Sequence, residues 1–443
     1  MGWTPRRPLV AGATLLLALA VLTLSCSTIK FPTLAPTGAA PPATPTTFSP
    51  KTEATIPAEK PTENPASTLS TPPVAKPAAK PIKIGFITPL TGRFAGYGAR
   101  QKIAVQLALD DVNKAGGING SPLEVITLDD AANPRETSIM VRRLATEDKV
   151  TAIIGPFTNA GFEVAAPLAN ELKVPLATTT ATKLGITDKN RPWVFRFAGM
   201  DTVFTPKAIE GYKKLYPNVR MMVISGDTKD AVNENIVKNN YPKALKDAGL
   251  EVVESVLFES GATDFSAIVT KIKRLNPEGI AFSSLTPEAV GFAREVQRQG
   301  IKAPVVASNQ NWGGPEIFLG KDVLDGWVVS GAFDEDAQDP LSKSFTERFS
   351  RIGADDPAVG KPAYAGNGAN AYDALLALAE VMRKAQITSD VDIQKARTAI
   401  LEGLLNLKGF KGLMGEINMQ PNGDITTNSM AFVARNGKWT LIK

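Results

Sequence analysis

Hydrophobic residues from Ile82 onward recur with two alternating periods. Lys83 to Thr88 alternates between apolar and polar residues and stops at Pro89, which is typical of a strand. The next segment, Tyr97 to Lys114, has the apolar spacing of one helix face, at Ile103, Leu107, Ala108 and Val112. Gly116-Gly117 supplies the left-handed stop that ends such a helix. The chain therefore starts its folded part as strand, loop and helix.

This alternation continues through the first part of the body. Asn133-Pro134-Arg135-Glu136 has the order of an N-cap, a first-turn proline and a capping-box glutamate, so a helix is expected there. A further helix is expected at Ala160 to Leu172. The expected strands are Leu123 to Leu128, Thr151 to Ile154, Pro175 to Ala177 and Val194 to Phe197. Strands alternating with helices predict an α/β fold with a doubly wound sheet.

A second alternating series begins at Arg220. Its expected strands are Arg220 to Ile224, Glu251 to Phe258, Gly279 to Phe282 and segments near Val305 and Trp327. Its expected helices are Glu234 to Ala248, Phe265 to Leu275 and Pro287 to Gln299. Pro242 is expected to kink or split the first of these helices, because proline lacks the N–H that a helix interior needs. The body thus predicts two lobes of the same class.

The chain becomes mostly helical after Asp334. The expected helices are Pro340 to Ile352, Gly368 to Lys384 and Asp392 to Leu401, and two short strands are expected around the turn Pro421-Asn422-Gly423. These helices have too few strands beside them to form a third domain, so we expect them to pack on the first lobe. The chain would then cross between lobes near Ala198, Gly331 and Met414. This assigns residues 82–199 and 334–413 to lobe 1, and residues 200–333 and 414–443 to lobe 2.

The N-terminus has the features of an export signal. Arg6 and Arg7 precede an apolar run from Leu9 to Leu24, and Ser25-Cys26 follows it directly. Cys26 is the only cysteine of the chain, which favours a lipoprotein signal at residues 1–26 with lipidation of that thiol and anchoring outside the cytoplasm. An ordinary signal peptide with a chance cysteine and a twin-arginine signal are the alternatives.

Residues 27–81 differ in composition from everything after them. They hold 13 of the chain's 33 prolines, with threonine, alanine and lysine and few aromatics. Such a segment buries too little apolar surface to fold. It is expected to be a disordered, semi-extended tether that holds the body away from a membrane surface.

Composition excludes several functions for the body. The formal charge of +5 falls to about +1 for the body once Arg6, Arg7 and the tether's surplus of two lysines are removed, so no nucleic-acid surface is expected. Histidine is absent, and no cysteine remains after Cys26. Histidine bases, thiol nucleophiles and histidine or thiolate metal sites are therefore excluded. We expect no catalytic residues, no metal and no cofactor, and hence no enzyme, although Asp/Glu chemistry is not formally excluded.

Several segments resemble one family in sequence and in order. These are KIGFITPLTG, AGGINGSPLEVITLDDAANP, IIGPFTNAGFEVAAPLANELKVPLATTTAT, ATDFSAIVTKIKRLNPEGI and AYDALLAL. The body resembles type I periplasmic binding proteins, specifically the leucine/isoleucine/valine-type solute receptors of ABC importers. The resemblance implies two Rossmann-like lobes, joined by three hinge crossovers, that close on a solute. It implies ABC permease subunits as partners and a monomer.

The resemblance also implies ligand-binding residues in the first lobe. The loop Gly155 to Asn159 opens a helix, whose free N–H groups favour a carboxylate. Tyr97 is expected to form a wall of the site, and Asn159 replaces a hydroxyl residue of the family. Thr180 would contribute its carbonyl and Thr182 its hydroxyl; a turn satisfied by its own backbone is the alternative. The first-lobe set is Tyr97, Phe157, Thr158, Asn159, Thr180 and Thr182.

The second lobe departs from the family pattern. Ala231 stands where a family aromatic is common, and Asn309 lies nearest the position of an acid that pairs with the ligand ammonium. Because a buried ammonium without a carboxylate is costly, either Asp227 or another acid takes over or the ligand has no ammonium. Trp312 and Tyr364 are candidate pocket aromatics, with core packing as the alternative. Asp201 and Asp334 lie near predicted hinges, with no expected ligand contact.

Three classes of function remain, the third being an enzyme on an α/β scaffold that uses Asp/Glu chemistry. The first is a receptor for a small amino acid or amino-acid-like solute that delivers it to the permease. The second is a sensor of the same fold for an amide, urea or an aromatic carboxylate. The solute, transport or sensing, and the type of cell envelope stay open.

Overall fold

The computed structural model describes residues 80–314, 316–361 and 363–443. The expected signal peptide, the lipidation site Cys26 and nearly all of the expected tether lie outside the described residues. Within the described part, no helix is both long and apolar enough to cross a bilayer.

The first sheet has five parallel strands in the order β2-β1-β3-β4-β5. The strands are β1 (Ile82–Ile87), β2 (Leu123–Leu128), β3 (Ala152–Ile154), β4 (Leu176–Thr178) and β5 (Val194–Arg196). Strand order reverses between β1 and β3. In open α/β sheets, ligands lie beyond the carboxyl ends of the strands at such a reversal.

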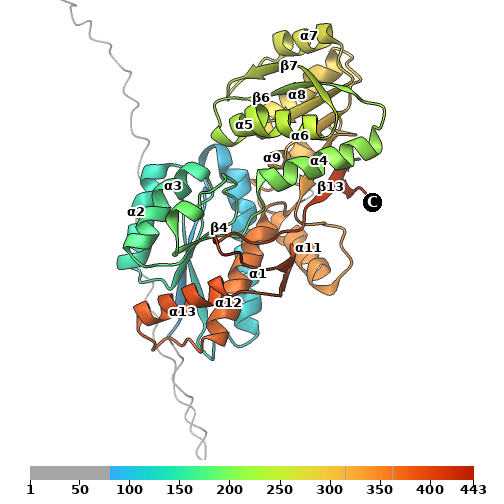
Figure 1. Ribbon diagram of the computed structural model, residues 1–443. Coiled ribbons are helices and arrows are strands. Elements are labelled where there is room, and N and C mark those ends of the chain that lie inside the picture. The colour runs from blue at the N-terminus through green and yellow to red at the C-terminus, as the bar shows by residue number, and fades with distance from the viewer. Residues whose placement is uncertain (1–79, 315, 362) are drawn as a thin grey trace, which may run out of the picture. The chain divides into compact units, whose positions relative to one another are not determined.

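Helices cover both faces of the first sheet (Figure 1). On one side lie α2 (Pro134–Thr146) and α3 (Asn159–Glu171), and on the other lies α1 (Ala95–Lys114). Asn133 caps α2 by accepting from the Arg135 N–H at 2.9 Å, as the sequence predicted. The fold class is therefore the expected doubly wound α/β type.

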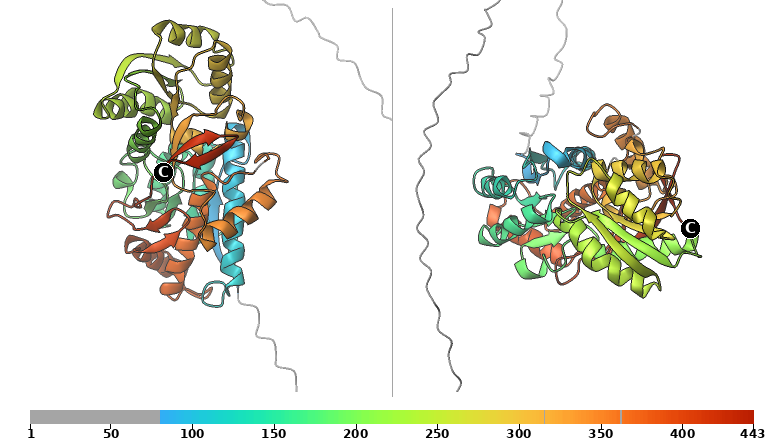
Figure 2. Two further views of the ribbon diagram at one scale, coloured as in Figure 1. Left: turned by 90° about the vertical axis from the view of Figure 1, so that its right-hand side faces the viewer. Right: turned by 90° about the horizontal axis from the view of Figure 1, so that it is seen from above.

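The second sheet has seven strands in the order β14-β13-β10-β9-β8-β6-β7. Five of them are parallel and repeat the first sheet's pattern, with a reversal between β6 and β8. These are β6 (Met221–Asp227), β7 (Glu251–Phe258), β8 (Gly279–Ser283), β9 (Val305–Ala307) and β10 (Val328–Gly331). The right-hand view of Figure 2 shows these green and yellow strands side by side. Both sheets therefore present the same kind of binding edge.

The second lobe's helices lie between its strands in sequence. They are α4 (Asp201–Leu215), α5 (Ala231–Asn235), α6 (Tyr241–Asp247), α7 (Ser266–Leu275), α8 (Thr286–Arg298), α9 (Asn309–Trp312) and α10 (Glu316–Leu319). One π-helical turn, Ile236–Asn240, separates α5 from α6 and ends just before Pro242. Pro242 has no N–H to give to a helix interior, so the expected split of this helix is confirmed.

Three late helices pack back on the first lobe, as expected. They are α11 (Pro340–Gly353), α12 (Gly368–Lys384) and α13 (Ile393–Leu405). Both α11 and α12 lie against α1, and α13 lies against α12. Arg348 of α11 forms an ion pair with Asp111 of α1 at 2.5 Å, and Tyr372 of α12 donates to the same carboxylate at 2.6 Å.

The C-terminal segment differs from the sequence expectation. The turn at Pro421 to Gly423 is flanked only by the single bridge Met419–Ile425. The closing hairpin is instead β13 (Met430–Arg435) and β14 (Lys438–Leu441). Its turn, Asn436-Gly437, has positive φ values of 51° and 75°, which suit asparagine and glycine.

The third crossing between lobes also falls later than expected. Strand β12 (Gly415–Ile417) pairs with β11 (Phe410–Gly412), which contacts α12 of the first lobe. Asp424 then bridges to Arg196 at the end of β5. The chain therefore stays with the first lobe past Met414 and crosses between Asp424 and β13. The first two crossings lie between β5 and α4 and between β10 and α11.

Candidate functional site

A cavity of about 330 Å³ lies between the two lobes. Its first-lobe wall comes mainly from the loops after β1, β3 and β4, and its second-lobe wall from the loops after β6, β8 and β9. The start of α12 and the hinge residues Ala198 and Gly199 complete the lining. The cavity therefore lies at the carboxyl ends of both sheets, where this fold class places ligands.

One part of the cavity wall is aromatic. Phe94, Tyr97 and Phe157 form a triangle of rings whose centroids are 5.6 to 6.2 Å apart. Leu285 of the second lobe packs against them. This cluster joins the lobes through apolar contact, and it offers a surface for an apolar or aromatic part of a ligand.

Two glycines set the backbone near the aromatic wall. An added Cβ at Gly98 would lie 1.8 Å from the Pro89 carbonyl oxygen, and one at Gly155 would lie 2.1 Å from the Ile87 carbonyl oxygen. Gly155 also has a φ of 104°. Both sites therefore need glycine because the backbone passes too close for a side chain. Gly98 belongs to the first turns of α1, directly after the ring of Tyr97.

Hydrogen bonds hold the loop between β3 and α3 in place. Thr158 caps α3, its Oγ1 accepting from the Gly161 N–H at 3.0 Å. Thr180 Oγ1 donates to the Phe157 carbonyl at 2.5 Å, and Asn159 Oδ1 accepts from the Lys183 N–H at 3.1 Å. These side chains order the loop, and Thr158, Asn159 and Thr180 themselves line the cavity.

The cavity also has buried polar atoms without a hydrogen-bond partner within the described residues. They are Asn309 Oδ1, Trp312 Nε1, Asn367 Oδ1 and Asn370 Oδ1. The orientation of Asn370 is fixed because its Nδ2 donates to the Thr179 carbonyl at 2.9 Å. Buried polar groups in proteins are nearly always paired with protein or water, so these atoms are available for hydrogen bonds with a polar ligand.

Asp201 lies directly behind this polar wall. It is the first residue of α4, and it is only 3% exposed. Its Oδ1 has no hydrogen-bond partner. Burial raises the pKa of Asp201 to about 7, although hydrogen bonds with the side chains of Thr182 and Asn309 and the charge of Arg196 lower it.

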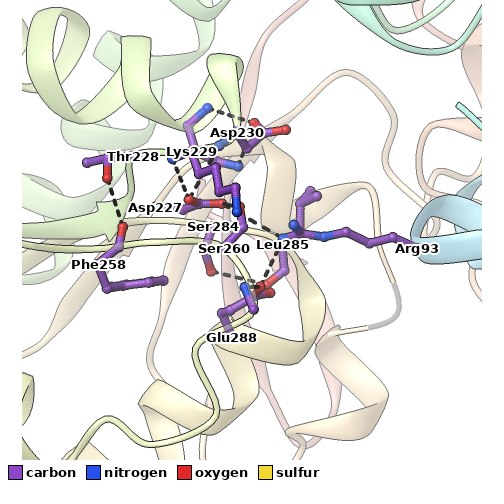
Figure 3. Close-up of polar contacts among 12 residues, drawn as sticks. Arg93, Asp227, Thr228, Lys229, Asp230, Phe258, Ser260, Ser284, Leu285 and Glu288 are labelled. Atoms are coloured by element: carbon purple, nitrogen blue, oxygen red, sulfur yellow. Dashed lines mark hydrogen bonds and ion pairs between the residues drawn. The ribbon is translucent and has the colours of Figure 1, made fainter. Parts of the chain in front are cut away.

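An ion pair crosses the cleft beside the cavity (Figure 3). Arg93 of the first lobe donates to Glu288 of the second at 3.0 Å and lies 3.8 Å from Asp227. Asp227 is fully buried, and its carboxylate accepts from the Lys229 N–H at 2.8 Å and from the Ser260 hydroxyl. Asp230 caps α5, and burial raises its pKa. Asp227 therefore orders the second-lobe loop.

The chain is similar in sequence to a family of known proteins. The sequence profile of the family described as Periplasmic binding protein matches residues 81–438. The chain belongs to the periplasmic binding protein family. The leucine-, isoleucine-, valine-, threonine- and alanine-binding protein of Pseudomonas aeruginosa is 26% identical over 350 residues, which are 78% of this chain and 88% of that one.

Two solved structures illustrate the likeness in fold. The branched-chain amino acid transporter substrate binding protein LivJ of Streptococcus pneumoniae, in complex with isoleucine, has a TM-score of 0.70 at 23% identity, covering 82% of this chain and all of that one. An ABC transporter solute binding protein of R. palustris, in complex with 4-hydroxybenzoate, has a TM-score of 0.68 at 20% identity, covering 82% and 96%. Both likenesses concern the fold alone.

The fold brings together most residues that the sequence selected for this periplasmic binding protein. Eight of the ten line the cavity: Tyr97, Phe157, Thr158, Asn159, Thr180, Thr182, Asn309 and Trp312. Asp227 and Tyr364 are absent from the lining. Tyr364 is buried with its ring centroid 6.4 Å from that of Trp312, and its carbonyl accepts from Arg100. Asp227 and Tyr364 therefore support cavity residues from behind.

Sequence reasoning missed several residues of the site. Phe94, Lys229, Asn367 and Asn370 line the cavity, and Asp201 lies behind it. Asn367 and Asn370 are polar residues three apart at the start of an otherwise apolar buried helix, a pattern that could have marked them. The signal for Phe94 was its position three residues before Tyr97. No local pattern distinguishes Asp201 from an ordinary helix-start acid.

Proposed function

We propose that this periplasmic binding protein is an extracytoplasmic receptor for a small amino acid or amino-acid-like solute. The observation that carries the proposal is the two-sided cavity: unpaired buried polar atoms on one part of its wall and aromatic rings on another. Such a cavity suits a small molecule with a polar head and an apolar side chain. The binding of leucine, isoleucine, valine, threonine and alanine by the Pseudomonas aeruginosa relative supports the same class.

Each end of the cavity has a role in this proposal. A ligand carboxylate would lie at the start of α3, where the helix N-terminus offers N–H groups and a positive end of its dipole. Thr182 would bond the polar head, and the Thr180 carbonyl would accept from it. The rings of Phe94, Tyr97 and Phe157 would cover the side chain.

Solute capture would proceed by hinge closure. The first lobe supplies the loops after β1, β3 and β4, so it would hold the ligand first. The second lobe would then add Leu285, Asn309 and Trp312 and complete the shell. The protein would act by binding, with no chemical step.

Delivery to the permease of an ABC importer, as a monomer, is the final part of the proposal. The two solved structures described above come from ABC transporter or amino-acid transporter systems, which supports it. Lipidation of Cys26 would keep the receptor at the membrane surface. Mass spectrometry of the mature N-terminus tests this anchor: a protein that starts elsewhere than Cys26, or carries no lipid there, contradicts it.

A second candidate ligand class has its own support. Lys229 lines the cavity, and Asn309 stands where an ammonium-binding acid was expected. A cation near an aromatic wall also suits an aromatic carboxylate, such as the 4-hydroxybenzoate held by the R. palustris protein. In that case the receptor would take an aromatic carboxylate, an amide or urea, for sensing or for uptake.

One ligand panel separates these candidates. The purified body is heated with aliphatic amino acids, amides, urea and aromatic carboxylates, and a true ligand raises the melting temperature because it binds only the folded state. Thr182→Val should weaken the binding of the solute that is found. A panel without any shift would contradict the small-solute proposal, and unchanged affinity in the variant would remove the role of Thr182.

A further inference from the structure

Two asparagines at the start of α12 differ from the apolar residues that make up most of this buried helix. Asn367 and Asn370 are three residues apart, so their side chains share one face, and both line the cavity. They are 8% and 6% exposed. Neither Oδ1 has a hydrogen-bond partner in the part of the chain that the structure describes. The cavity wall therefore has two amide oxygens that the protein itself leaves unpaired.

Asn367 occupies a position where asparagine usually has another task. It is the N-cap of α12, and an N-cap asparagine normally accepts a hydrogen bond from an N–H of the first helical turn. Here the side chain makes no such bond. Its φ of −70° and ψ of −2° also differ from the extended conformation of a typical N-cap. The Asn367 amide is therefore not needed to cap the helix, and it remains available to the cavity.

The amide of Asn370 has a fixed orientation. Its Nδ2 donates to the Thr179 carbonyl at 2.9 Å. Gln101 Nε2 donates in turn to the Thr179 hydroxyl at 2.8 Å, which holds Thr179 in place. Because Nδ2 is already paired, the end of Asn370 that is left for a ligand is Oδ1, a hydrogen-bond acceptor.

The second lobe adds a donor beside these acceptors. Trp312 of α9 lines the cavity and is 4% exposed, and its Nε1 has no partner among the described residues. Its ring packs on Gly331, where an added Cβ would lie 2.3 Å from the indole. The next residue, Gly313, lies against Asn367, since an added Cβ there would be 3.5 Å from the Asn367 Cβ. The indole and the two asparagines are therefore close together where the lobes face each other.

These three residues present polar atoms without a formal charge. Among the lining residues that the structure describes, the charged ones are Lys229 and Asp230, and both belong to the loop between β6 and α5. An ionised ligand group placed against Trp312 and the two asparagines would leave water without a counter-ion, which is costly. A neutral polar group fits this part of the wall.

The pattern of donors and acceptors selects one kind of neutral group. Two oxygens of the wall accept hydrogen bonds, and one N–H donates. A primary carboxamide has two N–H donors and one carbonyl acceptor, which is the complement of this set. A hydroxyl supplies a single donor, a carboxylate supplies none, and a hydrocarbon group leaves all three wall atoms unpaired.

We propose that Asn367, Asn370 and Trp312 form a subsite for a primary carboxamide, so that the solute is a small molecule with a neutral amide group. This inference rests on the proposed solute-binding function and narrows its ligand class. The amide N–H groups donate to the two asparagine oxygens of the first lobe, and the amide carbonyl accepts from Trp312 Nε1 of the second lobe. The bound amide thus joins the lobes, and the subsite is complete only when they are closed.

The first test compares carboxamides with molecules of similar shape. Isothermal titration is run with L-asparagine, L-aspartate and L-leucine, with L-glutamine and L-glutamate, and with propionamide and propionate. The best-bound carboxamide should bind at least about 100-fold more tightly than its carboxylate, because the carboxylate leaves both asparagine oxygens without a donor. L-asparagine should also bind at least about tenfold more tightly than L-leucine.

The possible failures of this test have different meanings. If L-leucine binds as tightly as L-asparagine, or a carboxylate as tightly as its carboxamide, water satisfies the wall atoms and the inference is overturned, while the solute-binding function stands. The same holds if no carboxamide binds but another solute does. If no solute of any class binds, the proposed function is overturned as well.

A substitution of Asn367 provides the second test. Asn367→Leu should weaken binding of the best carboxamide by about tenfold, because one amide N–H loses its acceptor, and should leave the affinity for L-leucine unchanged or higher. Asn240→Leu is the matched control, since Asn240 also has an unpaired buried amide atom and lies outside the cavity lining. It should change neither affinity. Equal losses for both ligands in Asn367→Leu would mean a structural role and would overturn the inference.

Thermal melting without ligand checks that both variants fold. If Asn367→Leu does not melt cooperatively, Asn367→Ser takes its place in the same comparison, because serine is smaller and still removes the amide.

Nuclear magnetic resonance gives a readout that a structural role would not produce. The indole N–H resonance of Trp312, assigned by its loss in Trp312→Phe, should move downfield when the best carboxamide binds, because Nε1 gains an acceptor. The indole resonance of Trp439, which lies outside the cavity lining, should stay in place. A Trp312 resonance that does not move on saturation with the carboxamide overturns the assignment of this donor.

Discussion

Arg93 and Glu288 join the two lobes through a hydrogen-bonded ion pair, with Arg93 Nη2 3.0 Å from Glu288 Oε1. The same Glu288 oxygen accepts from the Gly261 N–H at 2.8 Å, so its position is fixed within the second lobe. Arg93 is 32% exposed and Glu288 only 3%. Figure 3 shows Arg93 extending from the first lobe toward this second-lobe cluster. The pair exists only when the lobes are together, so it stabilises closure.

Removing this pair should therefore loosen the closed state. Arg93→Gln is expected to weaken solute binding by about two- to fivefold, mainly through faster dissociation, because a partly exposed ion pair contributes about 0.5–1 kcal/mol. Stopped-flow measurement of solute dissociation checks this. Arg142→Gln removes an exposed first-lobe pair with Glu171 and should leave dissociation unchanged. Equal rates in the parent and Arg93→Gln would show that closure does not depend on this contact.

Replacing the indole of Trp312 tests whether the polar atoms of the cavity wall bind the solute. Trp312→Phe removes an unpaired Nε1 donor from the cavity and keeps an aromatic ring, so solute affinity should fall about tenfold, near 1.4 kcal/mol. Trp439→Phe is the matched control, since Trp439 is 3% exposed, has an unpaired Nε1 and lies outside the cavity. Calorimetric titration of both variants measures the difference. Similar affinities would exclude Nε1 from ligand binding.

Arg196 and Asp424 form a buried ion pair that holds the C-terminal segment to β5. Asp424 also accepts from the Thr187 hydroxyl at 2.8 Å. Asp424→Asn should lower the free energy of unfolding by about 3 kcal/mol, because it leaves the Arg196 charge buried without a counter-ion. Asp325→Asn, in an exposed pair with Arg435, should cost less than about 0.5 kcal/mol. Urea unfolding followed by circular dichroism measures both, and equal costs would contradict the importance of burial.

Stability of the ligand-free protein should fall as pH rises from about 5 to 7.5. Burial raises the pKa of Asp201, Glu335 and Asp373 to about 7 each, above the value near 4 expected in the unfolded chain. The folded state therefore holds more protons in this range, and its stability decreases with pH and levels off above about 8. Melting temperatures across this range test the sign. Asp373→Asn should flatten the slope, and a rise in stability with pH would contradict the assignment.

Gly98 should tolerate no side chain. Gly98→Ala would place Cβ 1.8 Å from the Pro89 carbonyl oxygen, so the start of α1 and Tyr97 would have to move. We expect a loss of about 3 kcal/mol in unfolding free energy, the scale of an overpacked site. Gly313→Ala, whose Cβ would stay 3.5 Å from Asn367, should cost little. Denaturant unfolding of both variants distinguishes a steric requirement from a general cost of replacing glycine.

Much of the architecture could be read from local patterns. The strand Leu123–Leu128 and the helix Gly368–Lys384 have the bounds that periodicity gave. The closing hairpin was not predicted, because the turn was assigned to Pro421-Asn422-Gly423 and not to Asn436-Gly437. A turn signal alone does not tell which flanking residues find a partner strand. Here β13 pairs with β10 of the second sheet, and that partner lies about 100 residues earlier.

By itself, the sequence determined the two alternating lobes, the loops after β1 and β3, and most of the cavity residues on those loops. The hydrophobic period and the positions of glycines involve only a few neighbouring residues, so they can be recognised in the sequence. The tertiary structure decided which distant groups meet: Arg93 with Glu288, Arg196 with Asp424, and Asp201 behind Thr182 and Asn309. Whether a carboxylate is solvated, paired or left for a ligand depends on burial and on neighbours from other elements. Only the folded chain brings those neighbours together.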